Sequence, residues 1–236
     1  MLVKVTAIIP AAGQGRRMQA AVSKQYLLLA GLPLIVHTLQ VFQREPLIEE
    51  ILLVVGPNEV SWCQQEIVHR FGLTRVRAVL AGGRERQDSV YQGLRNLSEN
   101  CRWVAVHDGA RPLLTSSLLR RTITEAWQHG AAVAAVPVKD TVKIAGADQM
   151  VQTTLARDLL WCIQTPQVFN RDWLQEAYQQ ACKEGYYGTD DASLLERVGL
   201  PVKLVTGDYE NLKVTTPEDL DLAEAILARR KKEPCR

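Results

Sequence analysis

The sequence of 236 residues is long enough for one large domain or two small ones. Hydrophobic residues make up 47% and charged residues 23%, as in ordinary globular proteins. The 28 basic and 26 acidic residues leave a net charge of only +2. The one basic run, 228–236, ends the last predicted helix, so we expect no nucleic-acid partner.

The cysteines and the N-terminal residues indicate in which cellular compartment the protein is expected. The five cysteines are odd in number and no pair has C-x-x-C spacing, so neither a disulfide framework nor a zinc site is indicated. Reduced thiols in a cytoplasmic protein fit best. No apolar run reaches the roughly 18 residues of a membrane span, so no membrane partner is expected. The first residues predict a strand rather than a signal peptide, which indicates a bacterial-type cytoplasm or, after removal of a transit peptide, a plastid stroma.

Short β-branched runs alternate with longer segments of helical spacing along most of the chain. Strands are predicted at 3–9, 50–56, 76–83, 103–112 (running into a loop), 131–138 and 202–207. Helices are predicted at 34–45, 58–72, 86–97, 115–130 and about 171–185. A last helix begins at Pro217, with Thr216 as its N-cap and Asp219 as the second residue of a capping box. This alternation predicts an α/β fold with a mostly parallel sheet and helices on both faces.

Residues 140–155 break this rhythm with two β-like runs around "AGADQ", which predict an inserted hairpin. The hairpin either protrudes as an arm that packs on another subunit or folds back on its own domain. We expect one domain over 1–236, with a protruding dimerisation arm at about 137–158.

Residues 8–26, "IIPAAGQGRRMQAAVSKQY", leave the first strand through a glycine loop. Gly13 and Gly15 allow close approach of the backbone to a phosphate, and Arg17 and Lys24 flank them. A dinucleotide fingerprint would need a third glycine where this chain has Met18, and the P-loop pattern is absent. The loop therefore predicts a site for a polyphosphate of another kind.

Two further motifs end predicted strands at the same edge of the sheet. In "AGGRERQDSV" (81–90), Gly82 and Gly83 let a flat base approach the backbone, and Ser89 either bonds a base edge or caps the following helix. In "VHDGARP" (106–112), Asp108 either binds Mg²⁺ or a hydroxyl of ribose or substrate, or pairs structurally with Arg111. Asp108 is the only metal candidate.

Hydroxyl and basic residues are scattered over loops and element ends of the second half: Thr141, Arg157, Thr165, Thr189 and Lys213. Singly they indicate little. The sequence contains no Ser-His-Asp order, paired glutamates or metal-ligand spacing that would favour a hydrolase or a metalloenzyme.

Taken in order from residue 10 to 220, these stretches resemble one family: "PAAGQGRRM" with Lys24-Gln25-Tyr26, "GGRERQDSV", "VHDGARP", "VKDTVK", "TPQVF", "TDDASLLE" and "NLKVTTPEDL". The set is similar to 2-C-methyl-D-erythritol 4-phosphate cytidylyltransferases of non-mevalonate isoprenoid synthesis. The resemblance implies a Rossmann-like fold of the nucleotide-diphospho-sugar transferase type and a homodimer joined by the arm. It also implies the partners CTP and 2-C-methyl-D-erythritol 4-phosphate, with Mg²⁺ held mainly by the CTP phosphates.

The resemblance also implies site residues. Arg17, Lys24, Arg157 and Lys213 would be catalytic. Nucleotide and acceptor would be bound by Pro10, Ala11, Ala12, Gly13, Gly15, Gly82, Gly83, Ser89, Asp108, Gly109, Ala110, Arg111, Thr141, Thr165 and Thr189. Thr141 and Arg157, on the arm, would serve the partner subunit's site. Relatives that activate sugars often have proline before the catalytic lysine, where this chain has Ser23.

Two alternatives remain beside this interpretation. A ribitol 5-phosphate cytidylyltransferase would share fold and chemistry, but Pro10–Gly13 and Arg86–Val90 favour methylerythritol phosphate. A catalytically silent nucleotide-binding regulatory module would have lost its cations, whereas Arg17, Lys24 and Lys213 are present.

Overall fold

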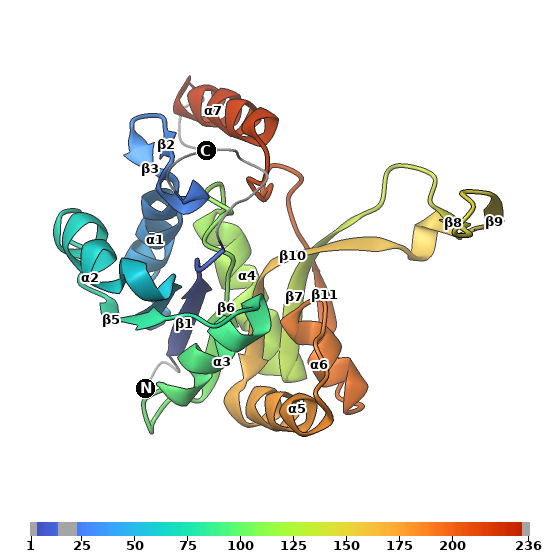
Figure 1. Cartoon of the computed structure of the whole chain (residues 1–236), viewed down its shortest axis with the longest axis horizontal. Helices are drawn as coiled ribbons and strands as arrows, with labels where there is room; N and C mark the ends of the chain where they lie inside the picture. Colours follow the sequence, from blue (N-terminus) through green and yellow to red (C-terminus); the bar gives the residue numbers. More distant parts are fainter. Residues whose placement is uncertain (1–3, 14–22, 233–236) are drawn as a thin grey trace.

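The computed structural model describes residues 4–13 and 23–232, and its centre is a seven-stranded sheet (Figure 1). The strand order is β11-β7-β10-β6-β1-β4-β5. The strands of this sheet are β1 Val5–Pro10, β4 Ile48–Val55, β5 Val76–Ala81, β6 Trp103–Val106, β7 Ala131–Pro137, β10 Trp161–Asn170 and β11 Lys203–Thr206. Its pairs are parallel except those that β10 makes with β6 and β7.

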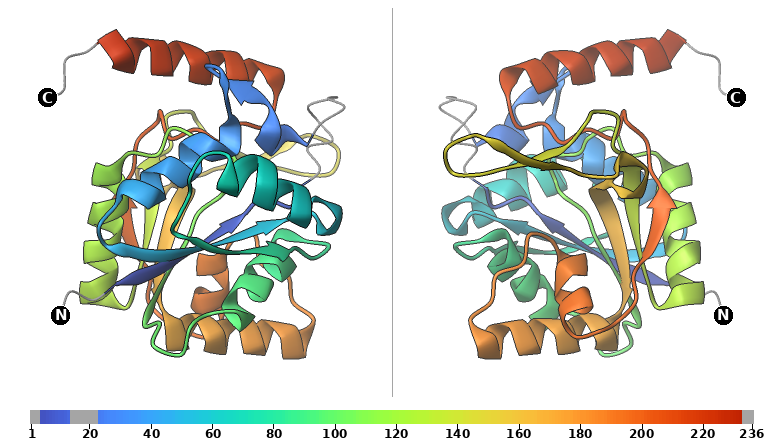
Figure 2. Two further views of the ribbon diagram at one scale, coloured as in Figure 1. Left: turned by 90° about the vertical axis from the view of Figure 1, so that its left-hand side faces the viewer. Right: turned by 90° about the vertical axis from the view of Figure 1, so that its right-hand side faces the viewer.

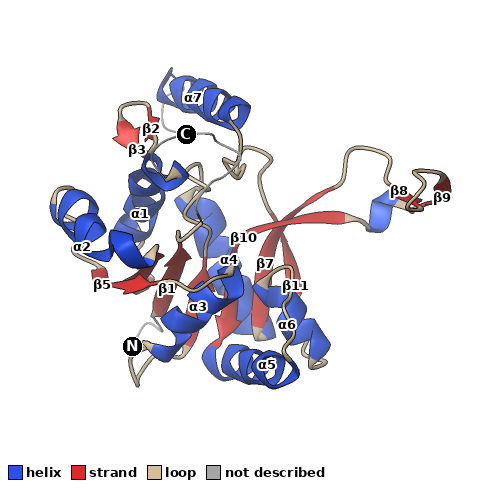
Figure 3. Cartoon of the chain, viewed as in Figure 1, coloured by secondary structure: helices blue, strands red, loops and turns tan. Residues whose placement is uncertain are grey.

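Helices cover both faces of this sheet (Figure 3). They are α1 Leu34–Arg44, α2 Val60–Cys63, α3 Arg86–Arg95, α4 Ser116–His129, α5 Arg171–Glu184, α6 Asp191–Arg197 and α7 Pro217–Lys232. One apolar core joins the sheet to α1, α2 and α4, and a second joins its other face to α3, α5 and α6. A third cluster packs α7 on the two-stranded ribbon of β2 Leu28–Leu29 and β3 Leu32–Pro33. The predicted α/β class, mostly parallel with helices on both faces, is confirmed.

The antiparallel strand β10 was not predicted from the sequence. Its central residues Gln164, Thr165 and Gln167 are polar yet buried, so the segment lacks the apolar run of its neighbours. Pro166 also speaks against a central strand, because proline cannot donate to a ladder. The register of β10 shifts against β7 between Ile163 and Gln167, which accommodates this irregular stretch.

Side-chain and glycine caps mark the ends of α4 and the start of α7. The Thr115 hydroxyl accepts a hydrogen bond from Leu118 N at 3.2 Å, and the C-cap Gly130 has φ +85°. At the start of α7 the Asp219 carboxylate accepts from Thr216 N at 2.9 Å, while Asp219 N donates to the Thr216 hydroxyl at 3.4 Å. These contacts confirm the capping box.

The predicted helix 58–72 is present but irregular. It begins with the 3₁₀ turn Pro57–Glu59, continues as α2 and widens into a π-helical segment, Gln64–His69. Gly72, at φ +60°, follows its end.

The inserted hairpin consists of β8 Lys143–Ala145 and β9 Val151–Thr154 and is followed by the 3₁₀ turn Arg157–Leu159. It projects away from the sheet (Figures 1 and 2). Every residue of both strands is exposed, and large apolar side chains lie on the hairpin and beside it: Ile144, Met150, Val151, Leu159 and Ile163.

Candidate active site

A cavity lies at the edge of the sheet where β1, β5 and β6 end. It is lined by Pro10, Ala11, Ala12, Gly13, Lys24, Gln25, Gly83, Arg84, Glu85, Arg86, Ser89, Asp108, Ala110 and Lys213. Most of the predicted site residues therefore meet in one place, although they come from motifs separated by up to two hundred residues. Gln25, Arg84, Glu85 and Arg86 also line the cavity and were not predicted as site residues. The only feature of the sequence that could have indicated these four residues is that they lie inside the quoted motifs.

The glycines beside the cavity permit two loops to pack closely. A Cβ on Gly82 would lie 2.6 Å from the Ala12 Cβ and 2.8 Å from the Ser89 hydroxyl oxygen. A Cβ on Gly83 would lie 2.2 Å from the Asp88 Cβ. The loops after β1 and β5 can thus touch only if Gly82 has no side chain, and Gly83 allows its own turn to close against the start of α3.

Ser89 is 2% exposed, and its hydroxyl already has partners within its own turn. It accepts from Gly83 N at 3.2 Å and donates to Glu85 O at 3.2 Å. Ser89 is not the cap of α3, because the N-cap is Glu85; its hydroxyl instead ties Gly83 to the first turn of the helix. Ser89 still lines the cavity beside Gly83.

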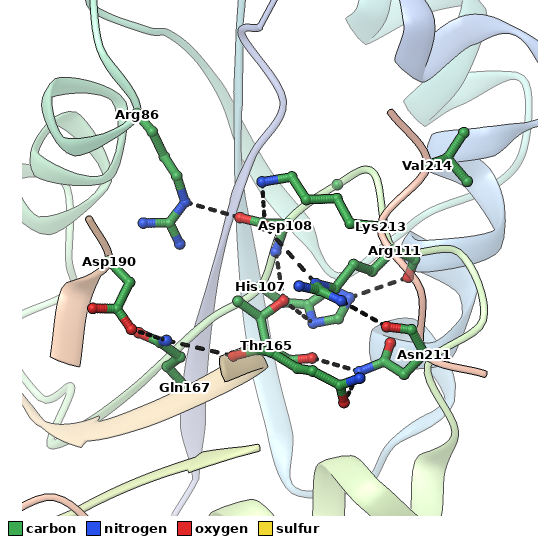
Figure 4. A network of polar contacts seen from close by, with 12 residues as sticks. Arg86, His107, Asp108, Arg111, Thr165, Gln167, Asp190, Asn211, Lys213 and Val214 are labelled. Atoms are coloured by element: carbon green, nitrogen blue, oxygen red, sulfur yellow. Dashed lines mark hydrogen bonds and ion pairs between the residues drawn. The ribbon is translucent and has the colours of Figure 1, made fainter. Parts of the chain in front are cut away.

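Asp108 is the hub of the charges in this cavity (Figure 4). Its Oδ1 lies 2.9 Å from Arg86 Nε, and its Oδ2 lies 2.8 Å from Lys213 Nζ and 3.9 Å from Arg111 Nε. Burial alone would raise the pKa of Asp108, but the charges of Arg86, Lys213 and Arg111 outweigh it and hold this pKa far below its usual range. Asp108 is therefore an ionised anchor for cations and not a proton acceptor.

Arg86 links Asp108 to a second buried carboxylate. Its Nη2 lies 2.8 Å from Asp191 Oδ2, and Asp191, which is 1% exposed, also accepts from the Tyr178 hydroxyl. The guanidinium is thus fixed at the cavity wall by two carboxylates. Asp191 lies 105 residues along the chain from Arg86, and no sequence pattern signals their contact.

His107 and Thr165 lie behind the cavity wall and do not line it. His107 Nε2 pairs with Arg111 O at 3.2 Å, and its Nδ1 lies 3.0 Å from the Thr165 hydroxyl. The same hydroxyl accepts from Asp108 N at 3.1 Å. Burial lowers the pKa of His107 to about 4, which keeps the imidazole neutral. In this chain Thr165 orients the Asp108 backbone, and its predicted contact with the acceptor stays a prediction.

The two lysines of the cavity meet on one rim. Lys213 is bound to Asp108, and the next residue, Val214, has its carbonyl 3.2 Å from Lys24 Nζ. Val214 N donates to Ala110 O at 2.8 Å, and Arg111 Nη1 donates to Asn211 O at 2.6 Å. The loop that carries Lys213 is therefore pinned on both sides of it.

The remaining predicted residues lie elsewhere. Gly109 is packed below the cavity, where its carbonyl accepts from the Thr38 hydroxyl at 3.1 Å. Thr189 lines a neighbouring hollow that shares Arg84, Glu85 and Arg86 with the cavity. Thr141 and Arg157 are exposed on the projecting hairpin and do not line the cavity of their own chain. Gly15 and Arg17 lie outside the described residues.

The residues at this site do not fit a protein-held Mg²⁺. Within 4–13 and 23–232, no group of three or more His, Cys, Asp or Glu side chains could hold a metal ion. Asp108, the only candidate, has one oxygen on Arg86 and the other on Lys213. Both oxygens of this carboxylate are thus committed to cations, which repel a divalent metal.

This is a nucleotide-binding α/β protein: the cavity lies at the carboxyl ends of parallel strands, a glycine loop borders it, and its clustered cations suit phosphate groups. The model of the IspD family, 2-C-methyl-D-erythritol 4-phosphate cytidylyltransferase, matches residues 5–229. The chain belongs to this family and is a nucleotidyltransferase.

Individual relatives agree with this assignment. The 2-C-methyl-D-erythritol 4-phosphate cytidylyltransferase of Syntrophus aciditrophicus is 51% identical over 226 residues, which cover 96% of this chain and 97% of the relative. That of Pelotomaculum thermopropionicum is 48% identical, with 96% and 95% covered. The crystal structure of the 4-diphosphocytidyl-2C-methyl-D-erythritol synthase of Anaerococcus prevotii is similar with a TM-score of 0.84, 33% identity and 96% of each chain covered. No helix among the described residues has the length and apolarity of a membrane span.

Proposed function

We propose that this chain transfers the CMP group of CTP to the phosphate of 2-C-methyl-D-erythritol 4-phosphate, giving 4-diphosphocytidyl-2-C-methyl-D-erythritol and pyrophosphate. The observation that supports this most is the cavity in which Lys24, Arg86 and Lys213 converge at the ends of parallel strands. The family match over residues 5–229 supports the choice of nucleotide and acceptor.

The reaction needs cations rather than a base. An oxygen of the acceptor phosphate, already anionic, attacks the α-phosphorus of CTP. A new P–O bond forms while the bond to the β-phosphate breaks, and pyrophosphate leaves with the electron pair. No proton has to move, which agrees with an Asp108 that is held ionised and a His107 that is buried and neutral. Catalysis then consists of positioning and stabilisation of charge.

The described cations divide this work. Lys24, with Arg17 of the same loop, would neutralise charge that builds on the α-phosphate and the leaving group. Lys213 and Arg86 are oriented by Asp108 and would hold further phosphate oxygens. The side chains of Lys213 and Arg86 are fixed before substrate binds, so little reorganisation is needed in the transition state.

We further propose that the enzyme is a homodimer and that the hairpin is the arm that joins it. Its exposed apolar side chains, among them Met150 at 68% and Leu159 at 79%, are the kind that an interface buries. Thr141 and Arg157 on this arm would then reach the acceptor phosphate in the partner subunit's site, near Thr189.

Mg²⁺ would enter with CTP, bound by the triphosphate, because residues 4–13 and 23–232 offer no set of ligands of their own. A bacterial-type cytoplasm is the compartment we propose. The free thiols of Cys63, Cys101, Cys162 and Cys182 suit its reducing conditions.

The proposal is tested by pyrophosphate release from CTP and Mg²⁺ with one acceptor at a time: 2-C-methyl-D-erythritol 4-phosphate, ribitol 5-phosphate or none. We expect release to depend on the first acceptor. Preference for ribitol 5-phosphate would overturn the acceptor but keep the chemistry. CTP binding without release for any acceptor would indicate a silent nucleotide-binding module.

A further inference from the structure

Glu59, on the turn that precedes α2, accepts hydrogen bonds from four donors. Its Oε2 accepts from Gly56 N at 3.1 Å, from the Tyr26 hydroxyl at 3.2 Å and from Gln25 Nε2 at 3.3 Å. Its Oε1 accepts from the Ser23 hydroxyl. Three of these donors belong to Ser23–Tyr26, the segment that contains Lys24, and only one belongs to the carboxylate's own turn.

This segment is fixed in other ways as well. Gln25 is 2% exposed and Tyr26 9%, and the Tyr26 ring meets Trp62 of α2 edge-on at a centroid distance of 4.6 Å. Burial, followed by the nearby Cys63 and Glu59, raises the pKa of Tyr26, so its phenol stays a donor. Lys24 lies between Ser23 and Gln25, and its side chain lines the cavity and reaches Val214 O.

At Ser23, the hydrogen bond to the Glu59 carboxylate does the work that a proline ring would do. Its φ of −55° and ψ of 134° are the backbone angles of a proline. A serine has no ring to hold these angles, but its hydroxyl is tied to Glu59 across 36 residues of sequence. A tertiary hydrogen bond thus limits the freedom of the residue before Lys24.

We propose that Glu59 is the positioning residue of Lys24: its carboxylate binds the donors on both sides of this lysine and so aims the ammonium into the cavity. The inference rests on the proposed role of Lys24 in cytidylyl transfer. Glu59 lines a hollow that adjoins the cavity, and the cavity-lining residue that it bonds is Gln25 of the same segment. It therefore acts on Lys24 through this segment.

The chemistry of the four partners explains why an acidic residue is needed. All four are donors, and an ionised carboxylate is an acceptor at both oxygens. A glutamine of the same shape would turn its NH₂ group toward at least one of these donors. Glu59→Gln therefore loses the charge and one acceptor oxygen; only the Ser23 or Tyr26 hydroxyl could turn to accept from the NH₂ group, and the remaining bonds are no longer charge-assisted, although the side-chain volume changes very little.

The test is a double-mutant cycle on kcat at saturating CTP and acceptor, with Glu59→Gln, Lys24→Ala and the double variant. We expect Glu59→Gln to lower kcat about 10- to 30-fold, the loss of about one charged hydrogen bond. In the Lys24→Ala background the same change should cost less than about threefold, because residues that act as a unit are not additive. Glu66→Gln, with its exposed Arg70 pair in the next turn, is the matched control and should leave kcat unchanged.

Two results would overturn the inference: a wild-type kcat in Glu59→Gln, or losses that multiply in the double variant, since multiplication means that Glu59 does not act through Lys24. If Glu59→Gln does not fold, Tyr26→Phe removes one donor but keeps the ring, and we expect about a threefold loss of kcat that disappears in Lys24→Ala. A full kcat in Lys24→Ala alone would instead overturn the catalytic role of Lys24, and no pyrophosphate release by the unmodified enzyme would overturn the proposed function.

Discussion

Asp108 shows how a single carboxylate organises a cationic site. It is 7% exposed, and a buried charge must be paired to be stable. Arg86 and Lys213 supply that pairing, and each thereby acquires a fixed direction. Because Arg86 is shared with Asp191, two carboxylates offset most of the charge of Arg86, Arg111 and Lys213 before substrate binds. Phosphate groups that enter the cavity therefore meet cations whose desolvation has already been compensated.

The loop cations provide the most direct test at this scale. We expect Lys24→Ala or Arg17→Ala to lower kcat by roughly 10²–10³, the usual effect of removing one preorganised donor in a transition state. Steady-state pyrophosphate release at saturating CTP and acceptor measures it. Arg44→Ala, at the end of α1 and away from the cavity lining, is the control. A near-normal kcat in either loop variant would contradict the assigned role.

His107 should make the stability of the protein depend on pH. Its pKa is lowered from 6.5 to about 4 by burial, so the folded imidazole stays neutral where the unfolded one takes up a proton. Stability should therefore be full above pH 6.5 and fall by about 3 kcal/mol as the pH drops toward 4. Urea denaturation at pH 7, 6, 5 and 4 measures this.

The matching variant is His107→Gln, which can still donate and accept but does not titrate. We expect its free energy of unfolding to change less with pH than that of the unmodified protein. His129→Gln, on the exposed end of α4, should keep the original dependence. An unchanged slope in His107→Gln would rule out His107 as the source.

At the scale of elements, the sequence predicted the repeating helices and parallel strands and the inserted hairpin, but it missed the antiparallel strand β10. The helices and parallel strands follow from periodicity and capping residues such as Thr115 and Thr216. Strand β10 does not, because its buried polar residues belong to contacts with distant elements: Gln167 Nε2 bonds Asp190 at 2.7 Å, and Gln164 Nε2 bonds Asp208 O at 2.8 Å. Such partners are known only once the chain is folded.

The same distinction applies to the site. Motifs located Gly83, Asp108 and Lys213, because each ends a strand or lies in a loop at the sheet edge. The contacts of Arg86 with Asp191 and of Glu59 with Ser23 join segments 105 and 36 residues apart. No spacing rule links such pairs, so the roles of Arg86, Asp191 and Glu59 were missed, whereas Asp108, Lys24 and Lys213 were located by their motifs.

The arm allows a prediction for an element. If its apolar side chains form the dimer interface, Leu159→Asp should shift the protein toward monomers and lower activity, because an uncompensated charge would be buried. Sedimentation velocity measures the mass. Leu222→Asp is the matched control, since Leu222 is 53% exposed on α7, outside the arm. A Leu159→Asp protein with the same mass and activity as the unmodified protein would argue against this interface.

For the whole molecule, the question is whether one chain contains a complete site. Lys24, Asp108 and Lys213 line the cavity of their own chain, whereas Thr141 and Arg157 are on the projecting arm. Arg157 Nη1 donates to Lys139 O at 3.0 Å, and Lys139 Nζ lies 3.5 Å from the centre of the Tyr209 ring. The root of the arm is thus tied to the loop that carries Lys213. Because Arg157 is proposed to reach the acceptor phosphate and not the nucleotide, we expect Arg157→Ala to raise the KM of the acceptor with little change in the KM of CTP.

Subunit mixing then tests whether the arm acts across the dimer. Lys24→Ala and Arg157→Ala proteins should each be poorly active at low acceptor concentration. In a mixed dimer one site combines both defects, whereas the other has an intact Lys24 and receives an intact Arg157 from its partner. Random exchange of subunits makes about half of the dimers mixed, so about a quarter of the sites should regain full activity. If Arg157 served its own chain, every site in a mixed dimer would keep one defect, and mixing would restore nothing.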